Sequence, residues 1–295
     1  MTTDSVTVDN TRISVAMHPA ADARLDLPLL VALHGGTYTR EYFNVAGSPA
    51  GSFVAVANRN GFSVLSIDRP GYGNSDHLAD EDNTFARQAE LLDGAIDQVL
   101  PESGASTVVL VGHSIGGMIG LELAARPPRW RLIGISATGC GAVIPSGGAA
   151  DTLASLPLTG VVDLPQADRD HVMFGPEGSY TAEALEAAHG SYAPVPAKEL
   201  SNAPAWPRER LAGVAAKITV PVHNALGEFD ALWDSSPGAR ASFVKAFTNN
   251  TRVEAELIRG AGHSIDHHSL GTAVHLKQLA FAHECAWLAA RSSST

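Results

Sequence analysis

The segment Gly112-His113-Ser114-Ile115-Gly116 has the composition of a turn that presents a nucleophilic serine. It follows the apolar run at 107–111 and precedes a stretch with helical spacing, which is the strand-to-helix context that a G-x-S-x-G motif needs. So sharp a turn strains the serine backbone, and the two flanking glycines relieve the crowding. We therefore expect Ser114 to be a nucleophile. A serine that only caps a helix is the alternative, but it gives the glycines no role.

A serine hydroxyl needs a histidine base, and the histidine needs a carboxylate to orient it. In the architecture that carries this motif, the acid and then the base follow the serine in the chain, each after a later strand. Asp230 follows the apolar run at 222–226, and His263 follows the run at 252–258. These two residues are the predicted acid and base.

Both assignments have rivals nearby in the sequence. Glu228 is the rival acid. Gly227 suggests a turn at residues 227–228, which would place the later carboxylate, Asp230, at the site. His267 and His268 are the rival bases. Because they lie one turn later, near the closing helix, we expect them at the surface.

The attack of a serine on an ester carbonyl creates an oxyanion, which backbone amides can stabilise. Ile115 begins the helix after the serine, so its amide is free for this role. The second donor is expected from Gly36 or Thr37, which follow the apolar run at 29–33 in a loop of small residues. We also consider His113, Trp206 and Trp233 as candidate substrate-binding residues, with ordinary packing as the alternative for each.

Short apolar runs alternate with longer stretches of helical spacing, which predicts a mostly parallel sheet covered by helices. This alternation of strand and helix patterns stops between about Cys140 and Lys217, where Pro, Gly, Ala and Ser are frequent. A connection of that length between two strands is too long to be a plain loop. We therefore predict a helical cap at residues 140–217, inserted into a core domain formed by residues 1–139 and 218–295.

Composition excludes several classes of protein. The chain has 295 residues with 20 basic and 31 acidic side chains, a formal net charge of −11, which disfavours nucleic acid as a partner. No basic, apolar leader and no stretch of 18 apolar residues is present, so we expect a cytoplasmic protein without a membrane partner. The two cysteines, Cys140 and Cys285, indicate neither a disulfide framework nor a thiolate metal site.

Together these residues resemble the α/β-hydrolase family of serine hydrolases, over essentially the whole chain. The resemblance rests on His34-Gly35-Gly36, the turn from Asp68 to Ser75, the elbow at Ser114, and the late Asp230 and His263. It implies a doubly wound, mostly parallel sheet of eight strands with the cap between strands six and seven. A serine at position 114 distinguishes the chain from subfamilies whose nucleophile is aspartate or cysteine.

The function predicted from these features is hydrolysis of a small, largely apolar carboxylic ester through an acyl-enzyme, with no metal or cofactor. Two alternatives stay open at this point. The same residues serve lyases and acyltransferases of natural-product tailoring, and a receptor-like protein can keep them for ligand binding. The sequence does not determine the oligomeric state.

Overall fold

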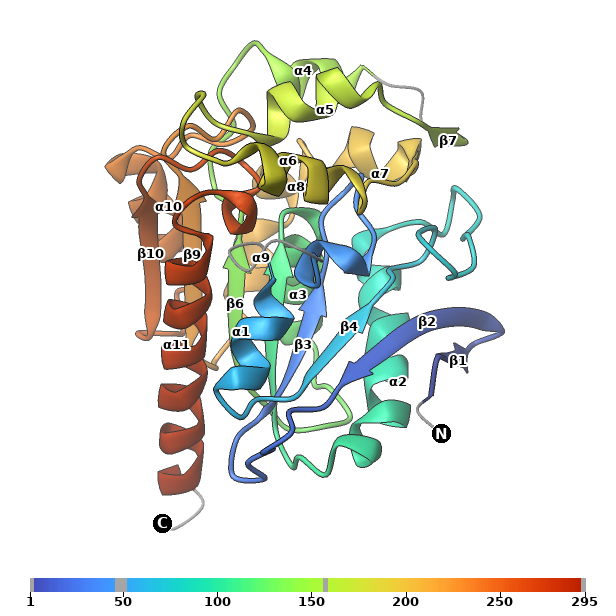
Figure 1. Ribbon diagram of the computed structural model, residues 1–295, viewed down its shortest axis with the longest axis vertical. Helices are drawn as coiled ribbons and strands as arrows, with labels where there is room; N and C mark the ends of the chain where they lie inside the picture. Colours follow the sequence, from blue (N-terminus) through green and yellow to red (C-terminus); the bar gives the residue numbers. More distant parts are fainter. Residues whose placement is uncertain (1–2, 46–51, 156–158, 293–295) are drawn as a thin grey trace.

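A mostly parallel sheet of eight strands forms the middle of the molecule (Figure 1). The computed structural model describes residues 3–45, 52–155 and 159–292. The strands of this sheet are β1 (Ser5–Val8), β2 (Thr11–His18), β3 (Leu29–Leu33), β4 (Val64–Ile67), β5 (Val108–His113), β6 (Leu132–Thr138), β9 (Val222–Gly227) and β10 (Val253–Ile258). Their spatial order is β1-β2-β4-β3-β5-β6-β9-β10; within this sheet, as far as the chain is described, β1–β2 and β2–β4 are antiparallel and the other neighbouring pairs are parallel. The predicted fold class is confirmed.

The central strands read as continuous apolar runs because helices cover both faces of the sheet. Every residue of β3, β4 and β5 is buried. Helices α1 (Phe53–Arg59) and α11 (Gly271–Ser292) pack together on one face, while α2 (Phe85–Ser103) and α3 (Ile115–Ala124) pack together on the other (Figure 1). Helix α10 (Pro237–Ala246) packs against β10.

The sequence predicts a helix that is capped by Asn83 or Thr84 and runs to about Leu100, before Pro101; helix α2 is longer than this. Thr84 caps its start as expected, its side chain accepting a hydrogen bond from the amide of Arg87 at 3.1 Å. The expected end before Pro101 is wrong, because the helix continues to Ser103 and ends at Gly104 with φ +70°. A proline in the last turn removes only one backbone donor, and glycine adopts the left-handed ending without strain. Within the described chain no helix is long and apolar enough to cross a bilayer.

Between β6 and β9 the chain leaves the sheet and crosses its C-terminal edge, where the strands end (Figure 1). This segment contains α4 (Ala149–Ala154), β7 (Val161–Val162), α5 (Gln166–Met173), α6 (Ala182–His189), β8 (Val195–Pro196), α7 (Ala197–Asn202), α8 (Trp206–Glu209) and α9 (Leu211–Ala215). The short antiparallel pair β7–β8 was not expected. The insertion lies between the sixth and seventh strands of the sheet, whereas its division as a separate domain at 140–217 stays a prediction.

Candidate active site

Ser114 stands in a strained turn between β5 and α3. Its backbone has φ +53° and ψ −123°, and its amide donates to the carbonyl oxygen of Thr138 at 2.7 Å. A Cβ on Gly112 would lie 2.5 Å from the carbonyl oxygen of Gly116, and a Cβ on Gly116 would lie 2.1 Å from that of Leu33. Neither position has room for a side chain. The two glycines of the motif thus permit the turn that presents Ser114.

His263 and Asp230 lie on the loops that follow β10 and β9, and the two loops touch backbone to backbone. A Cβ on Gly227 would lie 2.3 Å from the carbonyl oxygen of Gly262. The His263 Nδ1 atom lies 2.9 Å from Asp230 Oδ2, and Nε2 lies 2.9 Å from Ser114 Oγ. An ionised carboxylate only accepts, so Nδ1–H donates to Asp230 and Nε2 is left to accept the serine proton.

The second carboxylate oxygen of Asp230 is also occupied. Asp230 Oδ1 accepts hydrogen bonds from the amides of Leu232 at 2.9 Å and Trp233 at 3.1 Å, so the side chain is fixed from both sides. The rival acid, Glu228, points elsewhere, since its Oε2 accepts from the amide of Gly260 at 2.8 Å. The structure therefore brings Ser114, His263 and Asp230 together without Glu228.

The expectation that His267 and His268 lie at the surface is wrong. Each is 1% exposed, because the short helix η2 (Ile265–His267) turns them inward. His268 Nε2 accepts from the amides of Gly175 and Gly262, both at 2.9 Å, and this joins the segment after α5 to the loop of His263. His267 Nε2 donates to the carbonyl oxygen of Tyr42 at 3.2 Å, and burial lowers its pKa to about 4.

His113, a candidate for substrate binding, packs behind His263 and does not line the pocket beside Ser114. Its ring stacks on Tyr42 with centroids 4.5 Å apart and lies 5.1 Å from the ring of His263. Burial, and next the proximity of His263, lower the pKa of His113 well below its usual value. His113 is therefore placed as a neutral ring that supports the base.

The loop after β3 brings Gly36 and Thr37 to the wall of the same pocket as Ser114 and Ile115. Thr37 has φ +66°, an unfavourable conformation for a residue with a branched Cβ. The insertion holds it there: the amide of Ala193 donates to the carbonyl oxygen of Thr37 at 2.8 Å, and the amide of Thr39 donates to that of Ser191 at 2.9 Å. The shape of this loop thus depends on the insertion.

A buried arginine fixes the other side of the same loop. Arg69 Nε donates to the carbonyl oxygen of His34 at 2.8 Å, and its Nη2 donates to that of Gly35 at 3.1 Å. Its guanidinium is fully buried and pairs with the fully buried Glu199 of α7. In a planar trans peptide the N–H points opposite to the C=O. With the Gly35 carbonyl directed at Arg69, the Gly36 amide is directed away from it.

Sequence reasoning missed Glu199. Arg69 belongs to the turn from Asp68 to Ser75, on which the family resemblance partly rests. The residues around Glu199, in contrast, give no indication that its carboxylate is buried. Glu199 also accepts from the hydroxyl of Tyr72 at 2.5 Å and from Gln88 Nε2 at 3.3 Å. Only the packing of α7 against the core reveals this cluster.

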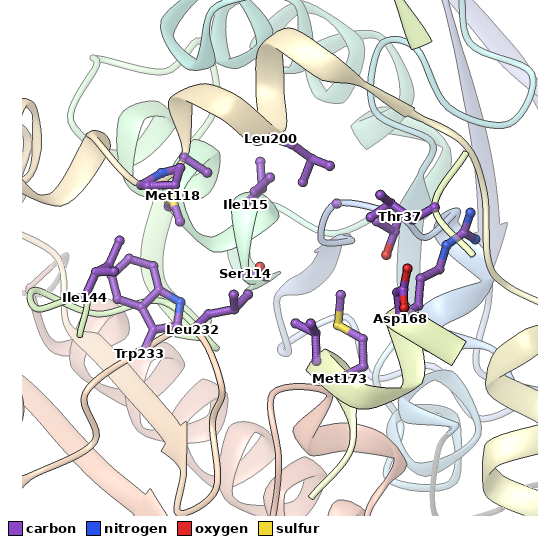
Figure 2. A pocket seen from close by; sticks show the side chains of 16 residues that line it. Thr37, Ser114, Ile115, Met118, Ile144, Asp168, Met173, Leu200, Leu232 and Trp233 are labelled. Atoms are coloured by element: carbon purple, nitrogen blue, oxygen red, sulfur yellow. The ribbon is translucent and has the colours of Figure 1, made fainter. Parts of the chain in front are cut away.

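The pocket beside Ser114 is mainly apolar (Figure 2). Its wall comes from the elbow, the loop after β3, the insertion and the loop after β9, and it consists of Gly36, Thr37, Ser114, Ile115, Met118, Ile144, Leu164, Asp168, Arg169, Val172, Met173, Leu200, Ala203, Pro204, Leu232 and Trp233. Trp233 lines it as predicted, whereas Trp206 does not. Trp206 instead packs on α3, where its Nε1 donates to Glu122 Oε1 at 3.0 Å.

Other reactive groups near the site are unsuited to chemistry. Cys140 is buried, and burial, with Asp230 next in importance, raises its pKa to about 12. Among the described residues, no group of three or more His, Cys, Asp or Glu side chains is arranged to hold a metal ion.

Comparisons with known proteins identify the family and the fold. Mouse (Mus musculus) sn-1-specific diacylglycerol lipase is 33% identical over 107 residues, which is 36% of this chain and only 31% of that protein. The esterase from Exiguobacterium antarcticum superposes with a TM-score of 0.69 at 17% identity, over 96% of this chain and 99% of that one. The monoacylglycerol lipase of Paleococcus ferrophilus gives 0.64 at 18% identity, over 93% and 98%. A model of the alpha/beta hydrolase family matches residues 30–274, so the chain belongs to that family of enzymes.

Proposed function

We propose that this protein hydrolyses a carboxylic ester of a small, largely apolar molecule through an acyl-enzyme on Ser114. One observation carries the proposal. Ser114 Oγ, the His263 ring and the Asp230 carboxylate are joined by two hydrogen bonds of 2.9 Å, at the wall of an apolar pocket. This arrangement gives a serine hydroxyl the base and the orienting charge that nucleophilic attack needs.

In the first half of the reaction, His263 Nε2 takes the proton from Ser114 as Oγ forms a bond to the ester carbonyl carbon. The amides of Ile115 and of Gly36 or Thr37 donate to the oxyanion that develops. Asp230 stabilises the imidazolium. When the tetrahedral intermediate collapses, the C–O bond to the alcohol breaks and His263 gives its proton to the leaving oxygen.

In the second half, His263 takes a proton from water, and the resulting hydroxide attacks the acyl-enzyme. The same amides bind the second oxyanion, and the bond between the acyl carbon and Ser114 Oγ breaks. His263 returns the proton to Ser114, and the free acid leaves. This cycle consumes only ester and water.

Two further facts support an apolar ester as the substrate. Most of the pocket wall consists of aliphatic, Met and Trp side chains, which favour a ligand of low polarity. The similar proteins include an esterase and lipases, although the alignment with the mouse lipase covers only part of either chain.

The test is turnover of p-nitrophenyl esters of increasing acyl length by the wild-type protein and by Ser114→Ala. We expect turnover to peak at one length, and the variant to lose at least about 10³-fold in kcat while its melting temperature stays near that of the wild type. Full turnover by the variant would refute the proposal.

Analysis of the products separates hydrolysis from its alternatives. Free acid with free alcohol indicates hydrolysis, free acid with a new double bond indicates elimination, and a new ester indicates acyl transfer. Tight binding without turnover would indicate a receptor.

A further inference from the structure

The pocket wall is chemically divided around Ser114. In Figure 2, Met118, Ile144 and Trp233 lie on one side of the serine, and Thr37 and Asp168 lie on the other. Arg169, which follows Asp168 on α5, belongs to the same wall. Asp168 and Arg169 are the only charged side chains in it among the described residues.

Two polar atoms of this wall have no hydrogen-bond partner in the part of the chain that the structure describes. They are Thr37 Oγ1 and Arg169 Nε, and both are buried. A buried donor without a partner is unfavourable by about 1–3 kcal/mol, so such atoms at a pocket wall are suited to bind a polar group of a ligand. The other buried atoms in this condition belong to residues outside the pocket wall.

The guanidinium of Arg169 is held in place by its surroundings. Its side chain is only 5% exposed, its Nη2 pairs with Asp163, and its Cζ lies 5.1 Å from the ring centroid of Tyr192. These contacts use the end of the side chain and leave Nε–H without an acceptor. Arg169 is therefore a preorganised donor with one hydrogen bond still to make.

The charges around this end of the pocket select the kind of group that fits. The Arg169 guanidinium is already paired with Asp163, and Asp168 lines the same wall, so a ligand carboxylate placed here would meet the negative charge of Asp168. A hydroxyl group fits all three pocket-lining side chains. The oxygen of such a group would accept from Arg169 Nε–H and from the Thr37 hydroxyl, and its proton would be donated to Asp168.

We propose that Thr37, Asp168 and Arg169 form a subsite for a neutral hydroxyl group of the substrate, opposite the apolar side that receives an alkyl chain. The proposal deepens the proposed function, since it specifies an ester that carries a free hydroxyl a few atoms from its carbonyl. Thr37 contributes through its side chain here and through its backbone near the oxyanion.

Binding to the Ser114→Ala protein tests the subsite without any turnover. Two matched pairs of esters place the hydroxyl on either part of the molecule: 2-hydroxyethyl hexanoate against n-propyl hexanoate, and hexyl 3-hydroxybutanoate against hexyl 3-methylbutanoate. Each pair is measured by titration calorimetry. We expect the hydroxyl ester of at least one pair to bind roughly tenfold more tightly, as one hydrogen bond to a charged donor allows.

The variants Arg169→Met and Asp168→Ala, each combined with Ser114→Ala, should reduce this preference to less than about twofold. Asp168 is exposed, so its replacement does not endanger the fold if Arg169→Met fails to fold. Arg208→Met is the matched control, because Arg208 is an exposed arginine of the same insertion outside the pocket wall. It should keep the full preference.

Equal binding within both pairs, or a preference that survives in both variants, would overturn the subsite. Tighter binding of monohexyl succinate than of either hydroxyl ester would overturn its selectivity for a neutral group. Turnover by the wild-type protein decides the proposed function separately. A hydroxyl preference without hydrolysis keeps the subsite and refutes the reaction, whereas Ser114-dependent hydrolysis without a preference does the reverse.

Discussion

At the scale of single residues, Asp230 and Glu228 show how two neighbouring carboxylates take different roles. The Asp230 side chain is fully buried between His263 and two backbone amides, whereas Glu228 binds the amide of Gly260 at a more exposed position. We expect Asp230→Asn to lower kcat by about 10⁴-fold, because an amide no longer stabilises the imidazolium. Glu228→Gln should stay within a few-fold of the wild type. Steady-state kinetics with one p-nitrophenyl ester check both, and equal losses would reopen the assignment of the acid.

The buried side chain of His267 makes the free energy of unfolding depend on pH. Burial lowers its pKa to about 4 from an ordinary value near 6.5. Between these values the unfolded chain binds a proton that the folded chain does not, so the free energy of unfolding falls as the pH drops from about 6.5 towards 4. Over that window His267 contributes on the order of 3 kcal/mol.

Urea unfolding at pH 7 and pH 5 measures this effect, with His267→Gln as the comparison. The glutamine keeps a donor for the Tyr42 carbonyl but does not titrate, so the variant should lose less stability between the two pH values than the wild type. Identical pH dependence in the two proteins would mean that His267 does not take part. His113, whose pKa burial also lowers, adds to the dependence in both proteins.

Sequence spacing predicted Ser114, Asp230 and His263 together, and the structure brings these three side chains into contact. Two glycines around a serine, and an acid and a base after later strands, leave few alternatives. It failed for His267 and His268, because their burial depends on the turn at 265–267 and on the contact of His268 with the insertion. The sequence on either side of His267 and His268 does not predict that contact.

At the scale of elements, Glu199 of helix α7 forms a buried ion pair with Arg69, which in turn donates to two carbonyls of the loop after β3. Removal of Glu199 would leave the Arg69 guanidinium charged and buried, which is unfavourable by about 3–5 kcal/mol. We expect Glu199→Ala to lower the free energy of unfolding by that amount. It should also lower kcat more than it raises KM, because Arg69 holds the carbonyls of His34 and Gly35 and thereby the loop near the oxyanion.

Lys198→Ala is the control on the same helix. It should change the free energy of unfolding by no more than a few tenths of a kcal/mol and leave kcat and KM near their wild-type values. Urea unfolding and steady-state kinetics are measured for both variants. A large loss of stability with unchanged kcat would show that the ion pair supports the fold without positioning the loop.

Elements, too, differ in how far the sequence predicts them. The strands at 29–33 and 64–67 follow from continuous apolar runs, since both faces of a parallel sheet are covered. The last turn of α2 and the pair β7–β8 do not follow from local pattern. The first depends on a glycine ending beyond a proline, and the second is a two-residue pairing that only the path of the insertion brings together.

At the scale of the whole molecule, the insertion contacts the core at several separate places, which include the bond from the amide of Gly175 to His268. Residues 191–193 bind the loop at 37–39, Glu199 binds Arg69, and Trp206 with Arg210 binds Glu122 of α3. The pocket lies among these attachments, with walls from both parts of the chain. Attachment and substrate contact are therefore separate roles for the residues around the pocket.

The two tryptophans separate these roles experimentally. Trp233 lines the pocket, so Trp233→Ala should enlarge it and shift the preferred p-nitrophenyl ester to a longer acyl chain. Trp206 donates to Glu122 away from the pocket, so Trp206→Phe should lower the free energy of unfolding by about 1–3 kcal/mol and leave the preferred chain length unchanged. Two hydrogen bonds, from Arg210 Nε to Glu122 Oε1 at 2.9 Å and from Arg210 Nη2 to Glu122 Oε2 at 2.8 Å, still hold the insertion to α3 in this variant.

The measurement is kcat/KM over the acyl series for both variants, with urea unfolding alongside. If Trp206→Phe moved the preferred chain length as Trp233→Ala does, the attachment at α3 would itself set the dimensions of the pocket. If neither variant moved it, the apolar side formed by Met118, Ile144 and Trp233 would not be where the acyl chain binds. A shift in Trp233→Ala alone places the alkyl chain on that side of Ser114 and leaves the side of Thr37 and Asp168 for the remainder of the ester.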